Sequence, residues 1–139
     1  MSVPRKSHSS CVLNHHLYVF GGKNRIDPLN SIEKLDLINQ TWSLIKVREI
    51  NERTHCIATP LNSRSVMICG GFCNETLTKL DTGFVFDTFR GEVTSTLPTL
   101  PLAFTCPWPS TMVRPGGVVA LVEDEENYDI KLVSLRDSS

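Results

Sequence analysis

The sequence has almost no excess of charge of either sign. Among 139 residues, 14 Lys and Arg stand against 15 Asp and Glu, which gives a formal net charge of -1. Such a chain has no overall field to attract a phosphate backbone or an anionic membrane surface. We therefore expect no nucleic-acid partner and no membrane partner.

Long hydrophobic runs are also missing. No apolar run approaches the ~20 residues that span a bilayer, and residues 1–10 are basic and polar with no signal-peptide core behind them. The cysteines are odd in number, so an oxidising compartment would leave at least one thiol unpaired. They are Cys11, Cys56, Cys69, Cys73 and Cys106. These features predict a cytoplasmic protein.

Helical periodicity is a third absence. No stretch of a dozen residues keeps apolar positions at helical spacing, and the 8 prolines and 8 glycines are spread among expected turns. The chain instead has short segments rich in Val, Ile, Leu, Phe and Tyr, separated by Asn, Asp, Gly and Pro. We expect an all-β protein of antiparallel strands.

The order of these segments repeats after about 50 residues, as in repeat architectures. The first copy carries Arg-x-x-His, a Tyr-x-Phe-Gly-Gly strand end, an Asp after an alternating strand, and a Trp six residues later. Its signature residues are Arg5, His8, Gly21, Gly22, Asp36 and Trp42. The second copy has, in the same order, Arg53, His55, Gly70, Gly71 and Asp87, with Val93 in place of the tryptophan.

The spacing between the copies changes slightly along the repeat. Gly21 and Gly70 are 49 positions apart, whereas His8 and His55 are 47 apart. We interpret this drift as a loop insertion and pair the two histidines. A third copy keeps only the strand pattern, and Glu123 stands near where its second glycine should be. The units predicted are 1–49, 50–101 and a degenerate, incomplete 102–139.

The signature resembles the kelch repeat, which forms the blades of a β-propeller. The resemblance is clear in the first two units and implies four antiparallel strands in each. It implies a kelch-type propeller segment of about three blades. Because propellers typically close with four to eight blades, this segment would be part of a larger ring. Further blades, a second copy or another subunit would then complete it.

Several residues have expected structural roles. A glycine pair at a strand end allows positive φ and lets a backbone or an aromatic ring approach closely. Trp42 is expected to cover its sheet beside the first pair and to supply much of the buried area. Asp36 and Asp87 are expected to cap their own turns. In the second unit, where Val93 fills less space, we expect compensation from three aromatics: Phe84, Phe86 and Phe89.

The candidate binding face consists of the loops that follow the glycine pairs, residues 23–30 and 72–79. Arg5 and Arg53 could donate charged hydrogen bonds to an acidic partner. His8 and His55 are further candidates for partner contact, and the family resemblance implies that they bridge neighbouring blades or line the channel.

Catalytic chemistry has little support in the sequence. His8, Cys11, His55, Cys56 and Cys106 fall at similar repeat positions and could be considered for zinc. Alternation along a strand, however, sends neighbours such as His55 and Cys56 to opposite faces. No phosphate-binding loop or nucleophile elbow is present. We expect no catalytic residues, no metal, no cofactor and no enzymatic activity.

The leading hypothesis is a protein–protein interaction scaffold or adaptor that binds through the loops of a kelch propeller. One alternative is part of a kelch-containing metalloenzyme or oxidase. Another is a structural fragment with no ligand of its own. The sequence does not identify the partner.

Overall fold

The structure is a computed structural model that describes residues 1–48, 50–97, 111–114, 117–124 and 129–135. These residues form strands and turns and no helix, so the described part of the chain is all-β as predicted. It accordingly contains no helix long and apolar enough to cross a membrane.

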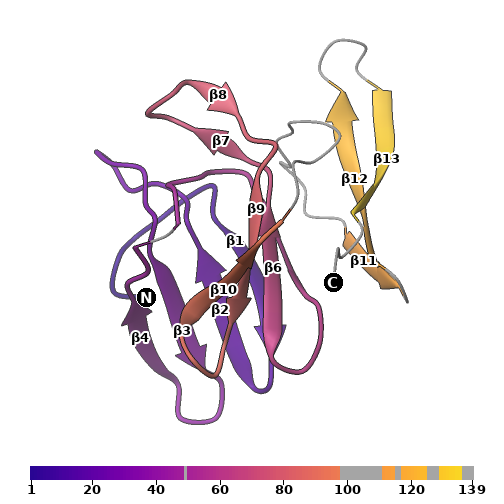
Figure 1. Ribbon diagram of the computed structural model, residues 1–139. Coiled ribbons are helices and arrows are strands. Elements are labelled where there is room, and N and C mark those ends of the chain that lie inside the picture. The colour runs from indigo at the N-terminus through magenta and orange to yellow at the C-terminus, as the bar shows by residue number, and fades with distance from the viewer. Residues whose placement is uncertain (49, 98–110, 115–116, 125–128, 136–139) are drawn as a thin grey trace.

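Two four-stranded antiparallel sheets form the best-defined part of the molecule (Figure 1). The first blade has the order β1-β2-β3-β4 and the second has β5-β6-β9-β10. The strands of the first blade are β1 (Ser9–Leu13), β2 (His16–Phe20), β3 (Ile32–Asp36) and β4 (Thr41–Ile45). Those of the second are β5 (Ile57–Pro60), β6 (Ser65–Cys69), β9 (Gly83–Asp87) and β10 (Glu92–Thr96).

The second blade also carries a short hairpin between its second and third strands. This hairpin pairs β7 (Phe72–Cys73) with β8 (Thr78–Lys79) and projects above the sheet (Figure 1). A third sheet contains β11 (Thr111–Arg114), β12 (Gly117–Asp124) and β13 (Asp129–Leu135) in that order.

The first strands of the three sheets are neighbours in space. Strand β1 contacts β5, and β5 contacts β11. Antiparallel sheets whose first strands gather in this way are the blades of a propeller. The structure thus confirms the predicted fold class, a propeller segment of about three blades, and the sheets within the described residues do not close into a ring.

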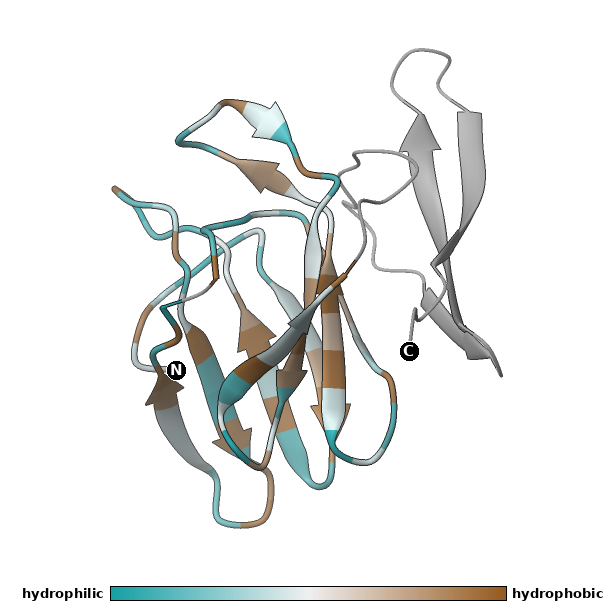
Figure 2. Cartoon of the chain, in the orientation of Figure 1, coloured by the Kyte–Doolittle hydropathy of each residue, from teal (hydrophilic) through white to brown (hydrophobic). Residues whose placement is uncertain are grey.

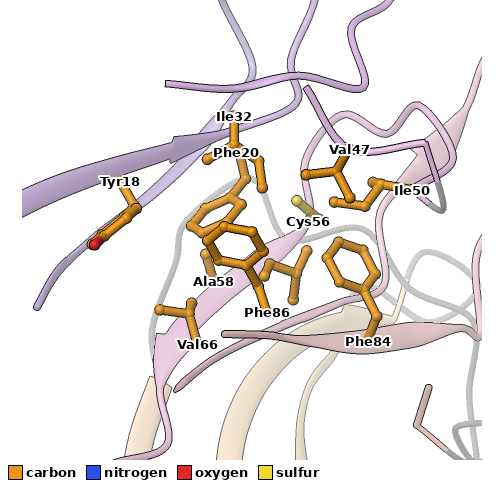
Figure 3. Close-up of a cluster of buried hydrophobic side chains, with 11 residues drawn as sticks. Tyr18, Phe20, Ile32, Val47, Ile50, Cys56, Ala58, Val66, Phe84 and Phe86 are labelled. Atoms are coloured by element: carbon orange, nitrogen blue, oxygen red, sulfur yellow. The ribbon is translucent and has the colours of Figure 1, made fainter. Parts of the chain in front are cut away.

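The main core lies between the first and second blades (Figure 3). Tyr18, Phe20 and Ile32 face it from the first blade, and Phe84 and Phe86 face it from the second. The ring of Phe86 meets those of Phe20 and Tyr18 edge-on, at centroid distances of 6.0 and 6.4 Å. Figure 2 shows hydrophobic positions concentrated along these strands.

Trp42 does not belong to this core, which corrects the expectation from sequence. It pairs with Leu35, away from the Gly21 end of the sheet, and is only half-buried. Because Ile45 on the same strand packs on the core, alternation places Trp42 and Leu44 on the face turned away from the second blade. Val93, the equivalent residue, does pack against the core.

The expectation for Phe89 is also wrong, whereas Phe84 and Phe86 fill the core. Phe89 lies in the turn between β9 and β10 and is largely exposed. The Arg64 guanidinium lies 5.1 Å from the centroid of its ring. Phe89 therefore adds nothing to the packing between the blades.

Candidate protein-binding face

Both glycine pairs lie where a loop segment meets the N-terminal segment of its own blade. Their φ angles are all positive, at 60° and 84° for the first pair and 67° and 100° for the second. A Cβ on Gly22 would lie 2.7 Å from the carbonyl oxygen of Lys6, and one on Gly71 would lie 2.6 Å from that of Thr54. The close neighbour is therefore a backbone segment in each blade, not an aromatic ring.

This approach allows short backbone pairing at the base of each loop. Lys6 and Lys23 exchange two backbone hydrogen bonds, both of 2.9 Å. Thr54 and Phe72 exchange two of 3.0 and 2.8 Å. The segment before each first strand thus holds the start of the loop that follows the glycine pair.

Arg5 and Arg53 fix these loops from inside the blades. Nη1 of Arg5 donates to the carbonyl oxygen of Gly21 at 2.9 Å and to that of Ser31 at 3.1 Å. Nη1 of Arg53 donates to the equivalent carbonyl oxygens, Gly70 at 3.0 Å and Thr82 at 3.1 Å. Each arginine therefore ties together the two ends of one loop.

Such burial argues against the partner contacts that we expected for these arginines. Arg5 is 8% exposed and Arg53 is 3% exposed. Their donors point at backbone carbonyls of their own blade. Both are positioning residues for the candidate face, and of the two only Arg5 also borders the hollow beside it.

The two arginines differ in what balances their charge. Nη2 of Arg5 lies 2.8 Å from Oε2 of Glu33, and neither side chain is exposed. At the matching strand position the second blade has Phe84, whose ring centroid lies 5.2 Å from the Arg53 guanidinium. One blade therefore uses a buried ion pair where the other uses a cation–π contact.

Glu33 is held in its charged form by several donors. Burial by itself raises the pKa of this carboxyl, but hydrogen bonds from Ser2 and the charge of Arg5 outweigh it and lower the pKa. Oε1 accepts from both the backbone nitrogen and the hydroxyl of Ser2, each at 2.6 Å. The first residues of the chain are thereby attached to the outer face of the first blade.

The two histidines are not equivalent, so their pairing by sequence is wrong by one position. Cβ atoms built on Gly22 and Gly71 would lie 3.0 Å from the Cβ atoms of His8 and Cys56, respectively. His55 instead matches Ser7, and both have positive φ, at 53° and 57°. With this correction the two copies are still 48 positions apart at Arg5 and Arg53, 49 at Gly21 and Gly70, and 51 at Asp36 and Asp87. The predicted loop insertion is therefore right, and only the histidine pairing changes.

His8 and His55 also differ in environment. His8 is exposed, whereas His55 is half-buried. The backbone nitrogen of His55 donates to the carbonyl oxygen of Ser7 at 3.0 Å, and that of Gly22 donates to Arg53 at 2.9 Å. The main chain at these positions therefore bridges the two blades, and partner contact by the imidazoles stays a prediction.

Asp36 and Asp87 organise the turns at the opposite edge of the blades. Oδ1 of Asp36 accepts from the backbone nitrogens of Ile38 and Asn39 at 2.9 and 3.0 Å. Oδ1 of Asp87 accepts from the two equivalent backbone nitrogens at 2.8 and 3.0 Å. These turns expose Ile38 and Phe89 at the same repeat position.

The loops 23–30 and 72–79 border two adjoining open hollows. One has a volume of about 670 Å³ and is lined mainly by residues 4–6 and 23–28. The other, of about 660 Å³, is lined by residues that include Arg48, Glu52 and Glu75. Pro28 and Asn74 line both hollows. Polar and charged groups from both blades thus meet at one surface.

Sequence reasoning missed Glu33, and it included Asn74 only as one member of the loop 72–79. A signal existed for Glu33, because it is a charged residue in an alternating strand at the position that Phe84 occupies in the next repeat. Nothing in the sequence distinguishes Asn74 within that loop, because its place at both hollows depends on how the fold brings the two loops together.

The metal hypothesis finds no grouping within the described part of the chain. There, no three or more His, Cys, Asp or Glu residues gather as they would around an ion. Burial raises the pKa of Cys11 to about 12, and a thiol rather than a thiolate is a poor zinc ligand. Cys106, the remaining candidate, lies outside the described residues.

Comparison with known families agrees with the geometry. A family model described as Kelch motif matches residues 4–46, which hold the whole first blade. A search of curated proteins found no match. The sheets are therefore kelch blades of a β-propeller fragment. The first blade therefore carries a kelch motif.

Proposed function

We propose that the protein is a protein–protein interaction scaffold or adaptor that binds its partner through loops 23–30 and 72–79. The observation that carries this proposal is the exposure of a large apolar side chain on each loop. Ile26 is 87% exposed and Leu77 is 76% exposed. Both loops are held at their bases by buried arginines, so the exposed side chains are presented on a rigid support.

The kelch family itself supports this class of function, because kelch repeats commonly serve protein interaction. The proposal includes a cytoplasmic location, which is supported by the odd number of cysteines in the sequence. The partner is a protein, with no nucleic acid, membrane or cofactor involved.

Photo-crosslinking tests the location of the binding face. A photoreactive amino acid placed at Ile26 or Leu77 should give the same crosslinked partner. The matched control is Ile38, which is 73% exposed but lies in the turn after Asp36. No adduct at Ile26 and Leu77, or the same adduct at all three positions, would contradict the proposal.

The two alternatives predict different results. A metalloenzyme or oxidase would hold copper, iron or zinc in stoichiometric amount, which metal analysis of the purified protein would detect. A structural fragment with no ligand would give no specific crosslink at any exposed position.

A further inference from the structure

We propose that the hollow lined by residues 4–6, 23–28 and Asn74 binds carboxylate side chains of an acidic peptide segment in a partner protein. This inference rests on the proposed function and adds the chemistry of the partner. Its evidence is the local charge, a buried donor and the form of the hollow.

The charge of the hollow differs from that of the whole chain. Its lining contains Lys6, Lys23 and Arg25 but only one acidic residue, Asp27. None of the three cations forms an ion pair with a described residue. A chain with a net charge of -1 therefore carries a local excess of positive charge at this surface. Carboxylates are the matching groups on a protein partner.

A buried donor without an acceptor lies at the same place. Nδ2 of Asn74 is out of contact with solvent and has no hydrogen-bond partner among the described residues. A buried polar group is costly when unpaired, so a rotation of the Asn74 side chain that brings Nδ2 to an acceptor on a ligand in the hollow would add affinity. A carboxylate oxygen is such an acceptor, and the neighbouring cations would favour its charge.

The form of the hollow suits a segment of polypeptide. A volume of about 670 Å³ is within the range of ligand sites. The hollow is open, however, and the exposed side chain of Ile26 stands among its lining residues. An apolar residue beside the acidic ones could pack against Ile26.

The adjoining hollow limits where the acidic residues can lie. Its charged lining residues are Arg48, Glu52 and Glu75, so carboxylates predominate. Oε1 of Glu52 accepts from the backbone nitrogen of Glu75 at 2.9 Å, which fixes this carboxylate beside the turn that joins β7 to β8. A bound peptide would therefore place its acidic residues over the first hollow and not over the second.

Fluorescence anisotropy with defined peptides tests the inference on the 139-residue chain. The probe is a labelled eight-residue peptide with four glutamates around one leucine, and the control peptide has glutamine in place of each glutamate. We expect the acidic peptide to bind at least tenfold more tightly, a difference of about 1.4 kcal/mol. Added salt should weaken its binding.

Variants of the chain locate the site. Lys23→Ala and Arg25→Ala should each weaken binding of the acidic peptide about fivefold to tenfold, and Asn74→Asp should weaken it further by placing a carboxylate beside the ligand. The matched control is Lys46→Ala, which removes the same charge at an exposed position outside both hollows. Lys23→Gln and melting curves separate a loss of binding from a loss of folding.

Equal binding of the two peptides would overturn the inference. Equal weakening by Lys46→Ala and Lys23→Ala would also overturn it, because the attraction would then be non-specific. The crosslinks from Ile26 and Leu77 test the proposed function separately from the peptide-binding measurements. If they persist while the peptides fail, the loops bind a partner of different chemistry and the proposed function stands.

Discussion

At the scale of single residues, Arg5 and Arg53 keep the same hydrogen bonds in two different surroundings. Both donate to the first glycine of their pair, although one faces a carboxylate and the other an aromatic ring. A guanidinium is suited to this role because its planar donors can reach two carbonyls at once. The arginine serves the geometry of the loop, and its charge is balanced separately in each blade.

The carboxylates of these blades predict how stability depends on pH. The pKa of Glu33 is lowered by its donors despite burial, and backbone hydrogen bonds from Asn39 and Ile38 lower that of Asp36. A lowered folded-state pKa adds stability above the unfolded value of about 4, and this stability is lost as pH falls through the folded pKa. Urea midpoints should therefore decrease between pH 6 and pH 3.

Two variants check the origin of this decrease. Asp36→Asn should reduce the slope of stability against pH. Glu92→Gln should leave the slope nearly unchanged, because Glu92 is exposed and its contact with Arg90 is 3.6 Å long. A wild-type midpoint that is constant or increases as the pH falls would contradict the assignment.

Two glycine substitutions should distinguish the stability cost of a strained φ angle from the cost of a steric clash. Gly22 and Gly91 both have positive φ, at 84° and 69°. A Cβ on Gly91 meets nothing within 4 Å, whereas one on Gly22 meets the Lys6 carbonyl oxygen. We expect Gly91→Ala to cost about 1 kcal/mol from φ alone and Gly22→Ala to cost clearly more. Equal shifts in the chemical-denaturation midpoint would show that the close approach adds nothing.

At the scale of elements, the sequence predicted the strands of the two full blades but not every segment between them. Alternating apolar positions and turn residues are sufficient for strands such as β2 and β9, because one or both faces are buried. The β7–β8 hairpin has two residues in each strand, which is too short for any period. The sequence accordingly predicts only a loop for residues 72–79.

Sequence indicates which strand a residue belongs to more readily than whether its face of the sheet is covered. The sequence places Trp42 on the last strand of its blade, and Trp42 lies on that strand, β4. Its burial, however, depends on which sheet covers that face, and no local pattern contains this information. The histidine pairing failed for a related reason, since a one-residue shift leaves the order of the signature unchanged.

Phe86 and Trp42 should therefore contribute differently to stability, because only Phe86 is packed between the two blades. Phe86→Ala should cost about 3–5 kcal/mol, because its ring lies fully within the core between the blades. Trp42→Ala should cost less in the 139-residue chain, since Trp42 is half-buried on the uncovered face. Urea denaturation of both variants measures the difference. Equal costs would show that the outer face of the first blade is already covered.

At the scale of the whole molecule, the face of the first blade that carries Trp42 is uncovered within the described part of the chain, whereas the corresponding face of the second blade is packed against a neighbouring sheet. Leu17, Leu35 and Trp42 are paired across β2, β3 and β4 just as Val66, Phe86 and Val93 are paired across β6, β9 and β10. The second set packs in or against the core formed with the first blade. The first set has no corresponding sheet among the described residues.

We therefore predict that the 139 residues are not self-sufficient as a monomer. Full burial of a Leu, Val or Phe side chain contributes about 1.5–3 kcal/mol, so an uncovered blade face forgoes several such contributions. Because a domain is stable by only about 5–15 kcal/mol, this loss is large enough to favour another blade on that face. The blade could come from further kelch repeats, a second copy or another subunit.

Size-exclusion chromatography with light scattering, combined with tryptophan fluorescence, tests this prediction. We expect aggregation, a dimer, or dependence on an added partner, with a blue shift of the emission when Trp42 becomes covered. The Trp42→Ala variant identifies that part of the signal, because the chain has a second tryptophan at position 108. A compact, cooperatively folding monomer of 15.5 kDa would show instead that the first blade tolerates an open face.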